Sequence, residues 1–167
     1  MSESHESGRK LADPGETPLV TDAVDVVGEL YRAFHTADRD TIVATVTRYF
    51  DAEVVLTEPD AMPWGGVYQG IDVVLPMIAA FADPGGPMPP EKIQVDQLFV
   101  QSVADGADEQ VVAAVSFPFQ GKETVVPMRA LEWFTVRAGK IVEIKIFQCE
   151  TVEALAALDG ELAADAT

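Results

Sequence analysis

The most constraining feature of the sequence is a series of long apolar segments separated only by short polar turns. Residues 92–103, 110–119 and 124–136 are rich in β-branched and aromatic side chains, which is typical of β-strands. A fourth such segment, residues 141–149, follows the turn at Ala138 and Gly139. Strands joined by short turns pair in antiparallel fashion. The C-terminal half is therefore predicted to form one sheet.

The N-terminal half carries helical patterns. Between residues 21 and 34, apolar side chains recur at intervals of three and four residues, which predicts one buried helical face. Asp38 or Asp40 is placed to cap a second helix over residues 41–49. A short strand at 53–57 ends before Pro59, a loop follows at 60–70, and a third helix is expected at 71–81. Together with a surface loop at 83–90 and a short helix at 151–158, this pattern indicates an α+β domain.

The strand at 110–119 is apolar on both faces, so both faces need cover. The three predicted helices can cover one face. Because the chain offers no further helices for the opposite face, a second copy of the protein is expected to bury it. The sequence thus predicts a homodimer formed through the outer face of the sheet.

Charge and length limit the class of protein. Eleven Lys and Arg against 28 Asp and Glu give a net charge of −17, which disfavours binding to nucleic acid or to anionic membranes. No apolar stretch reaches the roughly 20 residues of a membrane span, and residues 1–18 contain no signal-like apolar run, so a cytoplasmic protein is expected. Residues 1–20 are interpreted as a disordered tail, 21–158 as the domain and 159–167 as a frayed acidic end.

Metal and cofactor motifs are not found in the sequence. The chain has one cysteine, Cys149, and two histidines, His5 and His35, which cannot supply a zinc-type ligand set or a Ser-His-Asp or Cys-His catalytic set. The pair Gly65 and Gly66 is too weak a signal for a phosphate loop. The expectation is a protein without metal or cofactor.

Two glutamates are the candidate catalytic residues. Glu58 lies directly before Pro59, where a strand ends in a loop; a solvated loop carboxylate is the alternative interpretation. Glu132 lies within an apolar strand in step with Met128 and Phe134, where a carboxylate is costly unless it is used. Its alternative is an outward-facing or ion-paired position.

Two carboxylates in one apolar cavity would titrate apart, because desolvation raises both pKa values and mutual repulsion raises one further. Such a pair provides an acid and a base without any cofactor. A hydrophobic small molecule is the substrate that such a cavity would accommodate. The candidate substrate-contacting side chains, for which ordinary core packing is the alternative, are Tyr31, Trp64, Tyr68, Met128, Phe134 and Gln148.

Several local strings resemble one large family. They are Leu30-Tyr31-Arg32-Ala33-Phe34, Phe50-Asp51-Ala52-Glu53-Val54-Val55, Gly66-Val67-Tyr68-Gln69-Gly70-Ile71 and, above all, the stretch from Ala130 through Glu132-Trp133-Phe134 to Ile141. In order and spacing they resemble the domains of nuclear transport factor 2, the ketosteroid isomerases and the SnoaL-like polyketide cyclases. The resemblance implies a cone-shaped NTF2-like (cystatin-like) fold: three N-terminal helices on a strongly curved mixed or antiparallel sheet that encloses an apolar pocket.

The same resemblance implies a role for each glutamate. Glu58 before Pro59 matches the proton-shuttling carboxylate of the isomerases, and Glu132 matches their protonated acid, a site that is a standard example of pKa tuning. The isomerases' oxyanion tyrosine falls on Leu30 here, with Tyr31 one residue away. The resemblance therefore favours a cofactor-independent polyketide cyclase of secondary-metabolite (antibiotic) biosynthesis, with Glu58 as base and Glu132 as acid. The alternatives are an isomerase or epoxide hydrolase acting on a hydrophobic substrate, and a non-catalytic ligand-binding or dimerisation domain.

Overall fold

The computed structural model describes residues 22–80, 83, 85–102 and 108–159. The tail predicted at 1–20 lies outside these residues, and so does the tail predicted at 159–167 except for Asp159, which ends α4. The elements in chain order are α1 (Ala23–His35), α2 (Arg39–Tyr49), β1 (Phe50–Glu58), β2 (Gly66–Gln69), α3 (Ile71–Ala80), the 3-10 helix η1 (Pro90–Lys92), β3 (Gln94–Ser102), β4 (Asp108–Gln120), β5 (Val125–Arg137), β6 (Lys140–Gln148) and α4 (Thr151–Asp159).

Aspartates begin the first two helices. The Asp22 side chain accepts a hydrogen bond from the Val24 backbone N–H, and the Asp38 side chain accepts one from Thr41. A side-chain oxygen at this position satisfies one of the free N–H groups of a first turn, which stabilises a helix by about 1 kcal/mol. Of the two caps that the sequence offered for α2, the structure uses Asp38.

The six strands form one mixed sheet in the order β2-β1-β6-β5-β4-β3. All neighbouring strands pair in antiparallel fashion except β1 and β6, which are parallel. Two sequence predictions are corrected here. The loop predicted at 60–70 contains strand β2, a strand of four residues that pairs with β1. In addition, β1 begins at Phe50, directly after α2, three residues before the predicted start.

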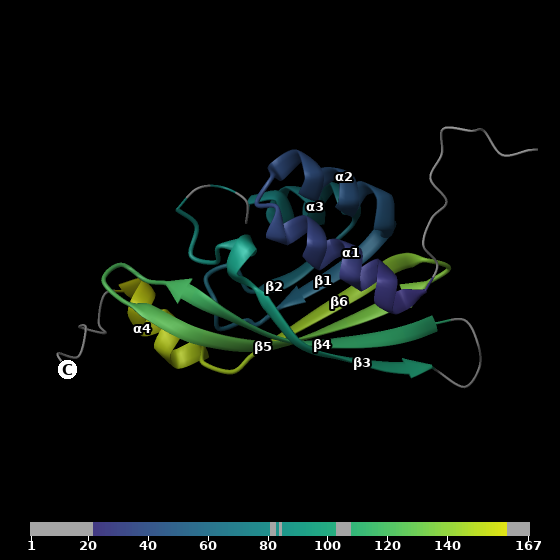
Figure 1. Cartoon of the computed structure of the whole chain (residues 1–167). Coiled ribbons are helices and arrows are strands. Elements are labelled where there is room, and N and C mark those ends of the chain that lie inside the picture. The colour runs from purple at the N-terminus through teal and green to yellow at the C-terminus, as the bar shows by residue number, and fades with distance from the viewer. Residues whose placement is uncertain (1–21, 81–82, 84, 103–107, 160–167) are drawn as a thin grey trace, which may run out of the picture.

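The three N-terminal helices lie together on one side of the sheet (Figure 1). Between them and the sheet lies one apolar core, in which Ile42, Val54, Phe119 and Phe134 are fully buried. This arrangement confirms the α+β class and the expected layer order. No helix in the described part of the chain is long and apolar enough to cross a membrane.

Strands β4 and β5 extend beyond their neighbours as a two-stranded hairpin. Pro118 and Pro127 lie opposite each other in this extension. They are tolerated because β3 pairs with β4 only up to Ser116, and β6 pairs with β5 only as far as Ala130. Helix α4 packs at the tip of the hairpin, at the left of Figure 1. There the Lys122 backbone N–H donates to the Ala157 carbonyl at 3.1 Å.

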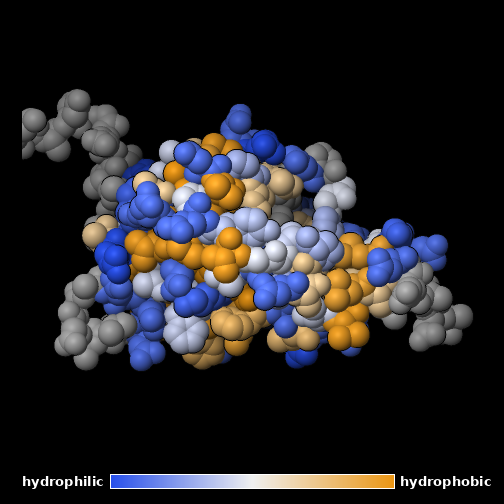
Figure 2. All heavy atoms as spheres, turned by 180° about the vertical axis from the view of Figure 1, so that it is seen from behind, coloured by the Kyte–Doolittle hydropathy of each residue, from blue (hydrophilic) through white to orange (hydrophobic). Residues whose placement is uncertain are grey.

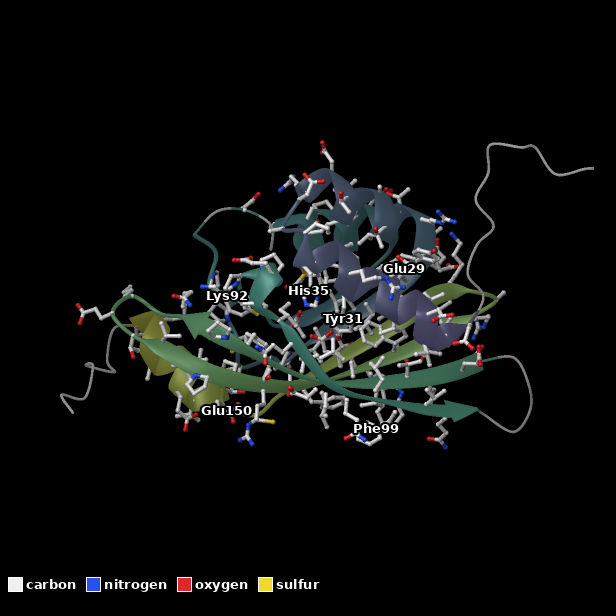
Figure 3. All side chains as sticks on the ribbon, in the orientation of Figure 1. Glu29, Tyr31, His35, Lys92, Phe99 and Glu150 are labelled. Carbon is white, nitrogen blue, oxygen red and sulfur yellow. The ribbon has the colours of Figure 1, made fainter. Side chains whose placement is uncertain are left out.

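The outer face of the sheet exposes large apolar side chains in two adjacent rows. Phe99, Val112, Trp133 and Lys145 form one row across β3 to β6, and Gln97, Ala114, Leu131 and Phe147 form the next. Phe99 and Phe147 are about half exposed, and Figure 3 shows Phe99 pointing away from the helices. From behind, hydrophobic side chains also reach the surface at the level of the sheet (Figure 2). The predicted pairing of this face with a second copy stays a prediction.

Candidate active site

A cavity opens between the helical layer and the inner face of the sheet. Its volume is about 60 Å³, several times what one ordered water occupies. The lining is apolar apart from three side chains, Glu58, Glu132 and Gln148. The apolar residues of the lining are Leu30, Phe34, Leu56, Ile78, Met88, Ile93, Phe117, Ala130, Phe134, Ile144 and Ile146. Of these, Met88 and Ile93 come from the segment between α3 and β3.

Strand register places the two glutamates in one row. On β5, Glu132 is the partner of Ile146 on the neighbouring strand β6. On the other side of β6, Thr57 of β1 pairs with Lys145, so the next residue, Glu58, lies level with Ile146. Residues in one row share a face, and all three line the cavity. The Cα atoms of the glutamates are therefore two strand spacings apart, about 9.5 Å.

Glu58 is the most deeply buried charged side chain among the described residues, with 2% of its surface exposed. Its Oε2 makes no hydrogen bond to any described residue. Desolvation, and secondly the charge of Glu132, raise the pKa of Glu58 to about 8, while the nearby Trp64 indole N–H lowers it slightly. Glu58 therefore holds its proton at neutral pH.

Glu132 has a dedicated hydrogen-bond donor. The Tyr31 hydroxyl donates to Glu132 Oε2 at 2.7 Å, and Figure 3 shows Tyr31 directed from α1 toward the sheet. Burial raises the pKa of Glu132, and the Tyr31 hydrogen bond opposes that rise because it stabilises the charged form. Burial, and then the Glu132 charge, hold the pKa of Tyr31 well above its usual value. The Tyr31 hydrogen bond thus favours the charged form of Glu132, whereas Glu58 Oε2 makes no hydrogen bond to any described residue, and Tyr31 keeps its proton as a donor.

The loop after β1 positions Trp64. Two successive turns fold it: the Met62 N–H donates to Pro59 O at 2.9 Å, and the Gly65 N–H donates to Met62 O at 2.8 Å. A Cβ at Gly65 would lie 2.2 Å from Pro59 O, so only glycine fits. The Tyr68 hydroxyl ties the loop to β2 by donating to Trp64 O at 2.5 Å. The loop is therefore a fixed support for the indole beside Glu58.

The structure brings some of the predicted site residues together and not others. Phe134 and Gln148 line the cavity with the two glutamates. The lining does not include Tyr31, Trp64, Tyr68 or Met128, and their contact with a substrate stays a prediction. The Tyr31 hydroxyl donates a hydrogen bond to Glu132, and the Tyr68 hydroxyl donates one to the Trp64 backbone carbonyl. Trp64 packs against Phe119, with ring centres 6.2 Å apart, and Met128 is buried in the core.

Sequence reasoning missed most of the apolar lining. Leu56 precedes Glu58 by two residues and lies on the same face of β1. Ile144 and Ile146 lie on the same face of β6 as Gln148. The period-two alternation of side chains along a strand predicts these three positions from Glu58 and Gln148. Leu30, the position at which the isomerases have their oxyanion tyrosine, lines the cavity itself. Met88 and Ile93 lie in a predicted loop and at a predicted strand start, and carry no such signal.

No described group of three or more His, Cys, Asp or Glu side chains is placed to hold a metal ion. The glutamate pair can act chemically on its own. A protonated carboxyl at Glu58 can donate to an oxygen at one end of the cavity. A carboxylate at Glu132 can accept a proton at the other. This is the arrangement required for general acid–base catalysis.

Comparison with known proteins identifies the family. The SnoaL-like domain model matches residues 27–144. A putative SnoaL-like polyketide cyclase from Jannaschia sp. CCS1 is 15% identical, with a TM-score of 0.55, covering 87% of this chain and 97% of that one. No curated protein sequence matches the chain.

Two further solved structures show how widely the fold is used. SalBIII, described as an epoxide hydrolase/cyclase-like enzyme in pyran ring formation of the polyether salinomycin, is 18% identical, with a TM-score of 0.53 and coverage of 77% and 91%. The CaMKII hub of S. rosetta is 22% identical, with a TM-score of 0.54 and coverage of 75% and 93%. At these identities the likeness extends to the fold alone.

Proposed function

The chain belongs to the SnoaL-like domain family, and on this premise we propose that it is a cofactor-independent cyclase that closes a ring in a polyketide-like substrate. One observation carries the proposal: two carboxyl groups of unequal pKa, Glu58 and Glu132, face one apolar cavity from the same row of the sheet. Family members named as polyketide cyclases have this fold.

The acid and base roles follow from the surroundings of each group. Glu132 is the base, because the Tyr31 hydroxyl stabilises its charged form. Glu58 is the acid, because its pKa of about 8 keeps it protonated at neutral pH. These roles are the reverse of those expected from the family resemblance, in which Glu58 was the base.

Ring closure on a hydroxy-epoxide illustrates the proton balance. Glu132 takes the proton of the attacking hydroxyl as its oxygen bonds to an epoxide carbon. The carbon–oxygen bond of the epoxide breaks, and Glu58 gives its proton to the leaving oxygen. The enzyme ends with Glu132 protonated and Glu58 ionised, and proton exchange with solvent restores the starting state. The apolar lining strengthens both interactions because it excludes water.

Turnover of a hydroxy-epoxide and of a hydroxy-enone, followed by liquid chromatography and mass spectrometry, tests the proposal. Glu58→Gln and Glu132→Gln should each lower kcat/KM by about 10²–10⁴-fold, the usual contribution of a general acid or base. Glu53→Gln, an exposed glutamate on the same strand, is the control and should be fully active. Full activity in both cavity variants would rule out the proposed mechanism.

Epoxide hydrolysis is the second candidate, since the same acid and base can activate water. A diol product rather than a cyclic ether would favour it. A steroid-type isomerase is disfavoured because Leu30 lines the cavity where that enzyme's tyrosine is expected, and the Tyr31 hydroxyl is already used by Glu132. A non-catalytic binding role predicts bound ligand without turnover.

We also propose that the outer sheet face pairs with a second copy of the chain. The cations on this face are already paired, Lys145 with Glu143 at 2.9 Å and Arg129 with Glu150. The face is thus close to neutral in a chain of net charge −17, so two copies can approach on it with little repulsion. Trp133→Glu should convert a dimer to a monomer in analytical ultracentrifugation. A wild-type monomer at 100 μM would contradict the pairing.

A further inference from the structure

Two of the buried polar side chains without hydrogen-bond partners line the cavity. Among the described residues, the buried side-chain atoms that make no hydrogen bond are Glu58 Oε2, Trp64 Nε1 and Gln148 Oε1. Leaving a buried polar atom unpaired costs about 1–3 kcal/mol. Glu58 and Gln148 both line the cavity, and Trp64 lies close enough to Glu58 to affect its titration. Protonated Glu58 and the Gln148 Oε1 atom therefore provide a donor and an acceptor for a ligand in the cavity.

Among the residues that the structure describes, none that lines the cavity is a cation. Its charged residues are the two glutamates alone, and the other polar residue is the neutral Gln148. A ligand carboxylate or phosphate in this cavity would meet negative charge with no Arg or Lys to compensate it, which is strongly unfavourable in an apolar site. The ligand is therefore neutral at the end that enters the cavity. An acid substrate would have to enter as its ester or thioester.

The spacing of the polar groups sets the spacing of the ligand's polar groups. Glu58 and Glu132 are separated by Ile146, which lies level with both on the strand between them. Apolar side chains, including Phe134 and Ile144, fill the next row of the same face. The two carboxyl groups are thus separated across the sheet by one apolar side chain, and their neighbours in the next row are apolar as well.

We propose that the cavity selects neutral, slim, apolar molecules with two oxygen functions at opposite ends: a carbonyl or ether oxygen that accepts from Glu58, and a hydroxyl that donates to Glu132. This substrate class rests on the proposed function, since the hydroxyl is the nucleophile and the acceptor oxygen belongs to the electrophile. Gln148 Oε1, one row further along β6, accepts from a second hydroxyl where the ligand carries one.

Unreactive probes test the class by isothermal titration calorimetry at pH 7. The reference probe is 4-(4-hydroxyphenyl)butan-2-one, which has a hydroxyl and a ketone at opposite ends of an apolar body. Removing the hydroxyl, as in 4-phenylbutan-2-one, should weaken binding about tenfold or more, because the lost bond is to a charged acceptor. Removing the ketone, as in 4-butylphenol, should weaken it about three- to tenfold.

A second comparison tests charge exclusion. Methyl 3-(4-hydroxyphenyl)propanoate should bind like the reference ketone. The corresponding free acid, ionised at pH 7, should bind at least 100-fold more weakly. Equal binding of ester and acid would overturn the proposed neutrality. Equal binding of all three probes in the first series would overturn the two-ended class.

Variants assign each end of the probe. Glu132→Leu should abolish the preference for the hydroxyl-bearing probe and leave the preference for the ketone; Glu58→Leu should do the reverse. Both place an apolar side chain in an apolar cavity, and circular dichroism and thermal unfolding check that each variant folds. Preferences unchanged in a folded variant would contradict the assignment. The probes cannot cyclise, so their binding tests the substrate class separately from turnover. The proposed substrate class can fail while the glutamate variants still abolish turnover. Conversely, turnover can be absent while the probes bind in the expected order.

Discussion

Replacing Glu58 by Gln should make the protein more stable at neutral and alkaline pH while removing the proposed acid. In the native state the pKa of Glu58 is about 8, against an ordinary value of 4.5. Between these two values the native state holds a proton that the unfolded chain has released. Stability from this group is thus fully present below pH 4.5 and is lost as pH rises toward 8.

The magnitude follows from the size of the shift. The two pKa values differ by about 3.5 pH units, and each unit corresponds to about 1.4 kcal/mol, so the wild-type protein loses up to about 5 kcal/mol between pH 4.5 and 8. Glutamine is close in shape to the protonated acid and does not titrate. The stability of Glu58→Gln relative to wild type should therefore rise by about 3–5 kcal/mol over that interval.

Urea unfolding followed by circular dichroism at half-unit pH steps measures this difference. The titration of Glu132 is present in both proteins and cancels in the comparison. Glu53→Gln, at an exposed position of the same strand, should leave the pH dependence of stability as in wild type. Parallel wild-type and Glu58→Gln curves from pH 4.5 to 8 would refute the argument that Glu58 is buried in its protonated form.

Three further substitutions test neighbouring parts of the structure. Tyr31→Phe removes the donor to Glu132 and should raise the pKa of that carboxyl, so the acidic limb of the pH–rate profile should move to higher pH; an unmoved limb would argue against Glu132 as the base. Gly65→Ala places a Cβ 2.2 Å from Pro59 O and should cost about 2 kcal/mol or more in urea unfolding, with a change in tryptophan emission; a neutral result would show that the loop is not tightly fixed. Ala138 lies in the β5–β6 turn with a φ of 48°, so Ala138→Gly should stabilise the protein by about 0.5–1 kcal/mol, measured as a rise in Tm. A lower Tm would contradict the left-handed conformation.

The sequence predicted the helices and the long strands because their apolar periodicity is strong and local. Strand β2 was missed because its stability comes from pairing with β1, a contact that local composition does not encode. Alternation correctly placed Glu132 with Phe134 on the inner face.

The site was less accessible to sequence reasoning. That Glu58 and Glu132 lie level with Ile146 depends on strand order and on a parallel pairing between the first and last strands, which no local pattern shows. The Tyr31 hydroxyl reaches Glu132 across 101 positions of the chain. This contact stabilises charge at Glu132, the residue first expected to be protonated, and is the reason why the proposed acid and base roles are the reverse of those expected.

The central claim is that the two cavity carboxyls hold different charges at neutral pH, Glu58 neutral and Glu132 ionised. Carbon-13 NMR of the glutamate side-chain carboxyls, assigned with Glu58→Gln and Glu132→Gln, measures both titrations directly in the folded protein. The Glu58 carboxyl should titrate with a midpoint near pH 8, and the Glu132 carboxyl should titrate at lower pH. A Glu58 midpoint near 4.5, or a Glu132 midpoint above that of Glu58, would contradict the account.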